Sequence, residues 1–205
     1  MNILVYGINF YPELTGIGKY TGDMCFELAR KHDVSMISAF PYYPNWKVQA
    51  PYSNRWWKKE VIRGVKVIRC PLFVPEKVSS IKRILHECSF LFSSSFALLS
   101  LLFKPIDVVV CIVTPFHLGI PARLFSWFKR VPMVYHIQDL QVNAARDLKM
   151  IQNEWLLQKL EKAERWILKQ TDITATISMG MIAKIKEKGI STDKIVFFPN
   201  WVDTQ

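Results

Sequence analysis

The chain has 205 residues, of which 50% are hydrophobic and 21% charged, and this composition excludes an intrinsically disordered protein. Lysine and arginine number 27 against 17 aspartates and glutamates, so the net charge of +10 predicts an acidic partner: a phosphorylated small molecule, an anionic lipid or a nucleic acid. The four cysteines include no C-x-x-C pair, which argues against a zinc site or a disulfide framework and indicates a reducing compartment. The first eight residues lack the basic region of a secretory signal, so no cleavable signal is predicted.

The stretch Asn2–Asp23 begins with an apolar, β-branched run and continues into a glycine-rich turn before a helical pattern. Such a turn places backbone N–H groups and a helix N-terminus at the carboxyl end of a strand, where α/β proteins bind anions. Gly16, Gly18 and Gly22 suggest a dinucleotide fingerprint, but eight residues separate Gly7 from Gly16 and the second strand ends without a carboxylate. A nicotinamide or flavin cofactor is therefore not expected. A plain helix-capping turn and a loop that closes over a phosphate-bearing ligand remain as alternatives.

The next hundred residues alternate regular elements with one aromatic loop. A helix is predicted over Ile17–Lys31, and strands over Val34–Ala39 and Val65–Cys70. Between the strands, Phe40–Lys59 holds three prolines and seven aromatic residues with no period, which predicts an irregular loop. Its aromatic residues would staple the loop to the surface, or form a platform for sugar rings or a membrane interface.

A long helix is predicted over Lys77–Phe103. Its sixteen residues from Cys88 onward carry no charge, but this run is shorter than the ~20 residues needed to span a bilayer and contains several serines. We expect this helix to pack against the sheet. In the alternative interpretation, its basic start at Lys82 and Arg83 and its apolar face touch a membrane surface.

The second half continues the alternation of strands and helices. The predicted elements are a strand Asp107–Val113, a helix ending at Lys129, a strand Val131–Ile137, a helix Met150–Gln170, a strand Thr171–Ile177, a helix Ser178–Lys188 and a strand Lys194–Phe198. This alternation predicts an α/β fold with a doubly wound parallel sheet.

Ligands of such sheets bind outside the carboxyl ends of the strands. The segments predicted there are Asn9–Gly18, Phe40–Trp46, Thr114–His117 and His136–Asp139. His136 ends a buried strand three residues before Asp139, and a neutral imidazole there could donate to a sugar hydroxyl or a phosphate while a carboxylate orients it.

The other three histidines are interpreted differently. His32 follows a surface helix, His86 is predicted to be a structural histidine of the long helix, and His117 is predicted to lie in a helix-capping region. The sequence has no nucleophile elbow, P-loop, H-E-x-x-H or D-x-D motif. Metal-independent group transfer from an activated, phosphorylated donor is the chemistry that remains.

Four segments together resemble a known family. VYGINFYPELTGIGKYTG, FPYYPNW, VYHIQDL and VFFPNWVD occur in the order found in the amino-terminal domain of family-4 glycosyltransferases, which have the two-domain GT-B fold. Within that family the segments are most similar to colanic-acid-type exopolysaccharide fucosyltransferases.

The resemblance implies transfer of a sugar, with retention, from a nucleotide-diphosphate sugar to a lipid-linked or oligosaccharide acceptor. It implies no metal or cofactor, and GDP-fucose is among the candidate donors. The residues implied as catalytic are His136 and Asp139; those against the donor diphosphate are Gly16, Ile17 and Gly18; those on the acceptor side are Tyr11, Glu13, Lys19, Tyr42, Tyr43 and Trp46.

The resemblance also implies a domain organisation. Residues 1–198 would form the Rossmann-like acceptor-side domain and residues 199–205 the remnant of a hinge, while a carboxyl-terminal domain that holds the nucleotide would act in cis or in trans. We therefore expect the chain alone to be inactive, and to work in the cytoplasm, peripherally on the inner face of the plasma membrane. The alternative is a membrane-surface or sugar-binding module without catalysis. A nucleic-acid binder is not favoured, because the basic residues are spread along the chain without a recognition motif.

Overall fold

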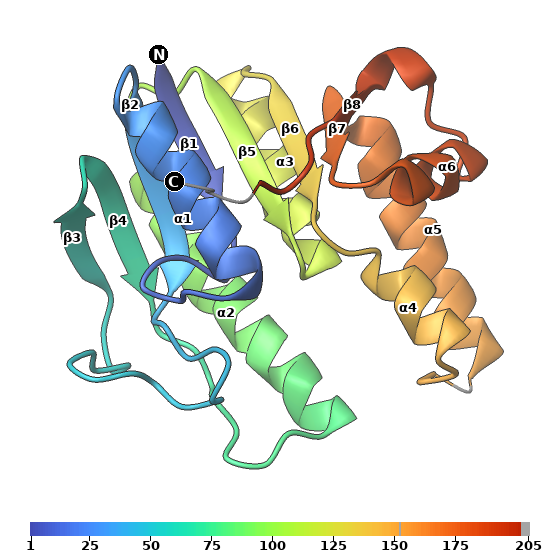
Figure 1. Ribbon diagram of the computed structural model, residues 1–205, viewed down its shortest axis with the longest axis horizontal. Coiled ribbons are helices and arrows are strands. Elements are labelled where there is room, and N and C mark those ends of the chain that lie inside the picture. Colours follow the sequence, from blue (N-terminus) through green and yellow to red (C-terminus); the bar gives the residue numbers. More distant parts are fainter. Residues whose placement is uncertain (152, 202–205) are drawn as a thin grey trace. The chain divides into compact units, whose positions relative to one another are not determined.

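A computed structural model describes residues 1–151 and 153–201. The chain divides into two compact units, residues 1–109 and 110–205, each built from strands and helices that alternate. The elements of the first unit are β1 (Asn2–Tyr6), α1 (Gly16–Ala29), β2 (Asp33–Ala39), β3 (Lys58–Ile62), β4 (Val65–Cys70) and α2 (Ser80–Ser100) (Figure 1).

The sheet of the first unit has the strand order β3-β4-β2-β1. β1 is parallel to β2, with Ile3 opposite Val34, and β2 is parallel to β4, with Ile37 opposite Ile68. Helices α1 and α2 cover opposite faces of these strands (Figure 1). Because β1, β2 and β4 run in the same direction, the loops that follow them start from the same edge of the sheet.

One strand of this unit was not predicted. The sequence predicted irregular chain over residues 40–59, which is wrong at its end, since β3 starts at Lys58 and pairs antiparallel with β4. A two-residue turn joins the two strands, and its residues Arg63 and Gly64 both have positive φ, at 47° and 84°. Such a turn forms a tight hairpin. β3 was missed because it lies at the sheet edge and is mostly exposed, so its sequence, KKEVI, lacks the apolar run of a buried strand.

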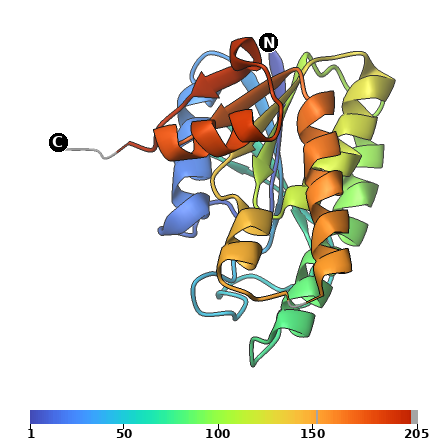
Figure 2. The ribbon, with the colours of Figure 1, turned by 90° about the vertical axis from the view of Figure 1, so that its right-hand side faces the viewer.

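The second unit continues from β5 (Val108–Val113), a strand that spans the boundary. It contains α3 (Gly119–Lys129), β6 (Met133–Ile137), α4 (Gln141–Asp147), α5 (Glu154–Gln170), β7 (Ile173–Thr176), α6 (Met179–Glu187) and β8 (Ile195–Phe197), with short 3-10 helices at Phe116–Leu118 and Thr192–Lys194. The strand order is β5-β6-β7-β8, and β7 pairs parallel with both β6 and β8. Helix α5 runs alongside α3 (Figure 2).

The predicted helix Met150–Gln170 is wrong in its boundaries. A separate helix, α4, precedes it, and α5 begins only at Glu154, where the side chain of Asn153 caps it by accepting a hydrogen bond from the N–H of Leu156 at 3.0 Å. The other predicted strands and helices are present within a few residues, so the prediction of a mostly parallel α/β fold is confirmed. Of the predicted hinge remnant, residues 202–205 lie outside the described residues.

Candidate functional site

The glycine-rich loop runs from the end of β1 to the start of α1. Gly16 has a φ of +59°, a left-handed conformation that favours glycine, and Thr15 occupies the N-cap position without a side-chain capping hydrogen bond. The first turn of α1 contains no acidic residue. The N–H groups of a helix N-terminus attract anions, and here neither the cap side chain nor a first-turn carboxylate satisfies them.

A buried carboxylate ties this loop to the aromatic loop that follows β2. Glu13 is 2% exposed, and its Oε1 accepts hydrogen bonds from the backbone N–H of Tyr42 and of Tyr43, each at 2.9 Å. Its Oε2 accepts a third from Asn9 Nδ2 at 2.8 Å. Burial raises the pKa of Glu13 above its ordinary value, although these hydrogen bonds act in the opposite direction. Glu13 was predicted on the acceptor side, and in the structure its carboxylate faces the backbone of the neighbouring loop.

The same carboxylate explains the glycine at position 18. A Cβ atom added to Gly18 would lie 2.7 Å from Glu13 Cβ and 2.8 Å from Glu13 Oε2, closer than real Cβ contacts. By contrast, a Cβ added to Gly16 would meet only Tyr43 Cε1, at 3.6 Å. Gly18 is therefore required by the packing of the loop itself. The predicted contacts of Gly16, Ile17 and Gly18 with a donor diphosphate stay predictions.

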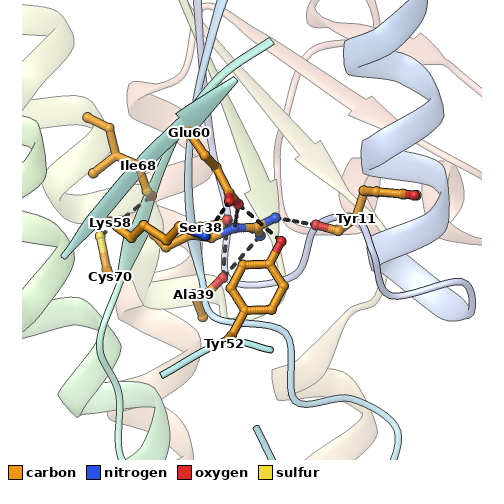
Figure 3. A network of polar contacts seen from close by, with 9 residues as sticks. Tyr11, Ser38, Ala39, Tyr52, Lys58, Glu60, Ile68 and Cys70 are labelled. Carbon is orange, nitrogen blue, oxygen red and sulfur yellow. Dashed lines mark hydrogen bonds and ion pairs between the residues drawn. The ribbon is translucent and has the colours of Figure 1, made fainter. Parts of the chain in front are cut away.

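A fully buried arginine fixes the start of the loop. Arg69, near the end of β4, donates through Nη2 to the carbonyl of Tyr11, through Nη1 to Ser38 Oγ at 2.9 Å, and through Nε to Glu60 Oε1 at 2.9 Å (Figure 3). Burial alone would raise the pKa of Glu60, but the hydrogen bonds from Arg69 and Lys58 lower it below its ordinary value. Sequence reasoning missed this hydrogen-bond network around Arg69, although a lone arginine in the strand VKVIRC was a signal.

The aromatic loop that follows β2 also packs against helix α2. The ring of Tyr42 lies 4.5 Å from the ring of His86 and that of Trp46 lies 5.0 Å from it, measured between centroids. His86 is buried and its Nδ1 lies 2.5 Å from the carbonyl oxygen of Phe73, which confirms that it is a structural histidine. Burial lowers the pKa of His86, so the ring is neutral near pH 7.

The predicted acceptor-side residues therefore divide by exposure. Tyr42 is buried at 5% exposure, whereas Tyr43 is 39% exposed beside Gly16. Lys19 is half-exposed and its Nζ lies 3.0 Å from Asp23 Oδ2 one turn along α1. The fold thus brings the loop carrying Tyr11 and Glu13 together with the loop carrying Tyr42, Tyr43 and Trp46. The acceptor role of these residues stays a prediction.

In the second unit, His136 occupies a buried position near the end of β6. It is 3% exposed, opposite Ala175 of β7, and the ring of Phe198 lies edge-on to it at 5.3 Å. Its Nε2 is 2.9 Å from Nε2 of Gln138, so with the imidazole neutral the amide donates to that nitrogen. Burial lowers the pKa of His136 to about 4.

The other ring nitrogen of His136 is left open. Nδ1 is buried and has no hydrogen-bond partner among the residues that the structure describes. Buried polar atoms are normally paired, so this nitrogen is an exception, as are His32 Nδ1 and His86 Nε2. Asp139 is exposed, and the side chain within hydrogen-bond distance of the imidazole is Gln138. The predicted catalytic roles of His136 and Asp139 stay predictions.

The described part of the chain contains neither a metal centre nor a membrane span. Across residues 1–151 and 153–201, no group of three or more histidine, cysteine, aspartate or glutamate side chains is placed to hold a metal ion. In the same residues, no helix combines the length and the apolar character that crossing a bilayer requires.

Comparison with known proteins identifies relatives of the chain. The family described as "Glycosyl transferase 4-like domain" matches residues 15–201. The chain is 42% identical over 206 residues to the "Putative colanic acid biosynthesis glycosyl transferase WcaI" of Escherichia coli (strain K12), in an alignment that covers 98% of this chain and 50% of that protein. The chain thus spans about half the length of this curated relative.

A solved structure supports the fold. The chain resembles the "Crystal structure of Anabaena Alr3699/HepE in complex with UDP-glucose" with a TM-score of 0.59 and 10% sequence identity, over 99% of this chain and 44% of that one. At this identity the likeness shows the fold alone. It confirms the predicted Rossmann-like architecture of the amino-terminal half of a GT-B fold.

Proposed function

Because the chain belongs to the glycosyl transferase 4-like family, we propose that it is the acceptor-side half of a retaining glycosyltransferase of exopolysaccharide biosynthesis. The donor in this proposal is a nucleotide-diphosphate sugar, and the acceptor is a lipid-linked saccharide or an oligosaccharide. The identity with a protein named for colanic acid biosynthesis supports the pathway, and the UDP-glucose complex of the structural neighbour supports the class of donor. GDP-fucose remains a candidate donor from the sequence resemblance.

The observation that carries the catalytic part is the open nitrogen of His136. The ring is buried and neutral, and one nitrogen faces Gln138 while the other has no partner in the described part of the chain. A neutral imidazole in that state can donate a hydrogen bond to a sugar hydroxyl at the reacting centre without bringing a positive charge into the site. In this proposal the exposed carboxylate of Asp139 shapes the rim of the same site.

In the first unit, the proposal assigns the donor diphosphate to the N-terminus of α1. The N–H group of Ile17 would face the phosphates, since α1 has no acidic residue of its own in the first turn and the carboxylate of Glu13 lies on the Gly18 side of that turn. Tyr43 and Lys19 are exposed enough to meet an acceptor. Glu13 and Tyr42 are buried, so their contribution is to position the two loops.

We further propose that the nucleotide is held mainly by a second domain, in cis or in trans, and that the 205-residue chain alone does not transfer sugar. The length of the curated relative, about twice that of this chain, supports this part. The reaction would take place in the cytoplasm at the inner face of the plasma membrane.

A chimera tests the proposal. In it, this chain replaces the matching half of the E. coli relative, and colanic acid production is measured in cells that lack that relative. We expect production with the chimera, loss with His136→Ala, and retention with His32→Ala, a matched substitution outside the site. Normal production with His136→Ala refutes the catalytic assignment. A soluble, folded chimera that binds sugar but never transfers it supports the non-catalytic module instead.

A further inference from the structure

Helix α2 carries large apolar side chains on two sides, because it buries Phe90 and Leu98 against the protein and also exposes a second set to solvent. Besides Phe90 and Leu98 it buries Ser93, Ser94 and Ala97, and the hydroxyl of Tyr6 lies 2.7 Å from Ser94 Oγ. A surface helix ordinarily turns its apolar stripe to the core and its polar stripe to water. The exposed apolar side chains of α2 therefore indicate a face that contacts something other than water.

The exposed side chains form one continuous stripe, which we call the α2 apolar face. Its members recur at intervals of three and four residues and so share one side of the helix: Ile81, Ile84, Leu85, Cys88, Phe92, Phe96 and Leu99. Ile81 is 73% exposed, Phe92 70% and Leu99 58%. Between Ile81 and Leu99 the stripe is about 27 Å long at the helical rise. Single exposed apolar residues are normal, but a contiguous patch marks an interaction site.

Tryptophan extends this face. Trp57, just before β3, donates from Nε1 to the carbonyl of Ser93 at 3.0 Å and lies edge-on to Phe96 at 5.9 Å. It is nevertheless 41% exposed, and the adjacent Trp56 is 75% exposed. Tryptophan is enriched where hydrocarbon meets water, since its ring is apolar and its N–H is polar.

The charges around the α2 apolar face are mainly of one sign. At the amino end of the helix, three basic side chains, Lys77, Lys82 and Arg83, are exposed beside one exposed acidic residue, Glu76. Within α2 the sequence has a single acidic residue, Glu87, which pairs with Arg83 at 3.4 Å. A basic flank beside an apolar stripe matches the chemistry of an anionic bilayer, in which phosphate headgroups lie above the acyl chains.

We propose that the α2 apolar face docks on the surface of a bilayer that contains anionic lipid. The helix lies along the interface, with Phe92 and its neighbours among the upper acyl chains, Trp56 and Trp57 at headgroup level, and the lysines against phosphates. The proposal rests on the proposed function in one respect, since a lipid-linked acceptor would be delivered at that surface. Vesicle binding itself does not depend on sugar transfer.

Flotation of the 205-residue chain with vesicles tests the proposal. We expect binding to vesicles of phosphatidylcholine with phosphatidylglycerol, and weaker binding to vesicles of phosphatidylcholine alone. The triple variant Ile81→Gln/Phe92→Gln/Leu99→Gln should partition at least about 100-fold less, because it removes three insertable side chains that make few contacts within the protein. The control is Met179→Gln, which removes an equally exposed side chain, at 67%, from α6.

A second variant tests the electrostatic part. Lys77→Gln/Lys82→Gln should weaken binding to the anionic vesicles about 25-fold, at roughly fivefold per lysine, and should leave binding to the neutral vesicles unchanged. Circular dichroism and the melting temperature establish that each variant is folded.

Three results would overturn the proposal. The first is an absence of flotation with the anionic vesicles, and the second is flotation of the folded triple variant at the level of the unsubstituted chain. The third is a dimer in sedimentation that the triple variant converts to monomer, which would assign the face to a second copy. The His136→Ala variant separates the two proposals, since it should float normally, and loss of transfer with normal flotation bears only on the catalytic assignment.

Discussion

Removing the carboxylate of Glu13 should loosen the two loops that it joins. In Glu13→Ala the N–H groups of Tyr42 and Tyr43 lose their acceptor, and the amide of Asn9 loses a partner. A buried donor left unpaired costs about 1–3 kcal/mol. Since the Tyr42 bond is buried and the Tyr43 bond part-buried, we expect the free energy of unfolding to fall by about 2–4 kcal/mol.

The conservative variant separates the hydrogen bonds from the charge. In Glu13→Gln the amide oxygen still accepts from both backbone N–H groups, and the new NH₂ group meets Asn9, whose own amide turns to present its oxygen. Because burial raises the pKa of Glu13, the neutral amide also avoids the desolvation of a carboxylate. We therefore expect Glu13→Gln to change the free energy of unfolding by less than about 1 kcal/mol.

Urea denaturation at neutral pH measures both values, and hydrogen exchange locates the effect. Amide protection should fall over residues 9–18 and 41–46 in Glu13→Ala and should be retained in Glu13→Gln. Equal losses of stability in the two variants would refute the hydrogen-bond account, because only one of them removes the acceptor. Unchanged stability in Glu13→Ala would refute the view that this side chain holds the loops.

Three other predictions concern the buried positions Gly18, His136 and Arg69. Gly18→Ala should lower the free energy of unfolding by about 1–3 kcal/mol, because its Cβ would lie 2.7 Å from Glu13 Cβ. Gly180→Ala, with free space around it, should raise it by up to ~1 kcal/mol. Thermal melts compare the two variants, and a change of stability in the same direction in both would refute the packing account. The pKa of His136 is about 4 in the folded state against about 6.5 in the unfolded state, so stability is lost as the pH falls from about 6.5 to 4, on the order of 3 kcal/mol in total. Urea denaturation across this pH range should show that His136→Gln lacks this loss. Arg69→Met should lower the free energy of unfolding by about 3–5 kcal/mol, since Glu60 and the carbonyl of Tyr11 lose their shared donor. A denaturation midpoint equal to that of the parent would contradict a structural role for the Arg69 hydrogen bonds.

Periodicity predicted the buried elements well and the edges poorly. The run VVVCIV and the strand that carries His136 are apolar because both of their faces are covered, so their sequences reveal them. β3 sits at the sheet edge, and four of its five residues are charged or exposed, so only pairing with β4 makes it a strand. Helix α4 has seven residues and buries only Val142, so its sequence carries no helical stripe.

The position of the candidate loops at the ends of the strands was predictable, but the contacts within these loops were not. The rule that ligands bind at the carboxyl ends of parallel strands pointed to the loops after β1 and β2 and to His136. That Glu13 would turn inward depends on Tyr42 and Tyr43, about thirty positions away in the chain, presenting their amides to it. Likewise, Arg69 reaches Tyr11 across 58 positions. Such contacts are set by tertiary structure, and no local pattern contains them.

The two glycines that open α1 have different surroundings, and this difference limits the side from which an anion can reach the helix. At Gly18 the side chain of Glu13 fills the space that a Cβ would take, so that side of the turn faces the protein. Gly16 is exposed, left-handed, and faces only the ring edge of Tyr43. A diphosphate at this helix would therefore approach over Gly16 and meet the first N–H groups of α1. Tyr43, which is 39% exposed, is the side chain of the aromatic loop that lies beside Gly16.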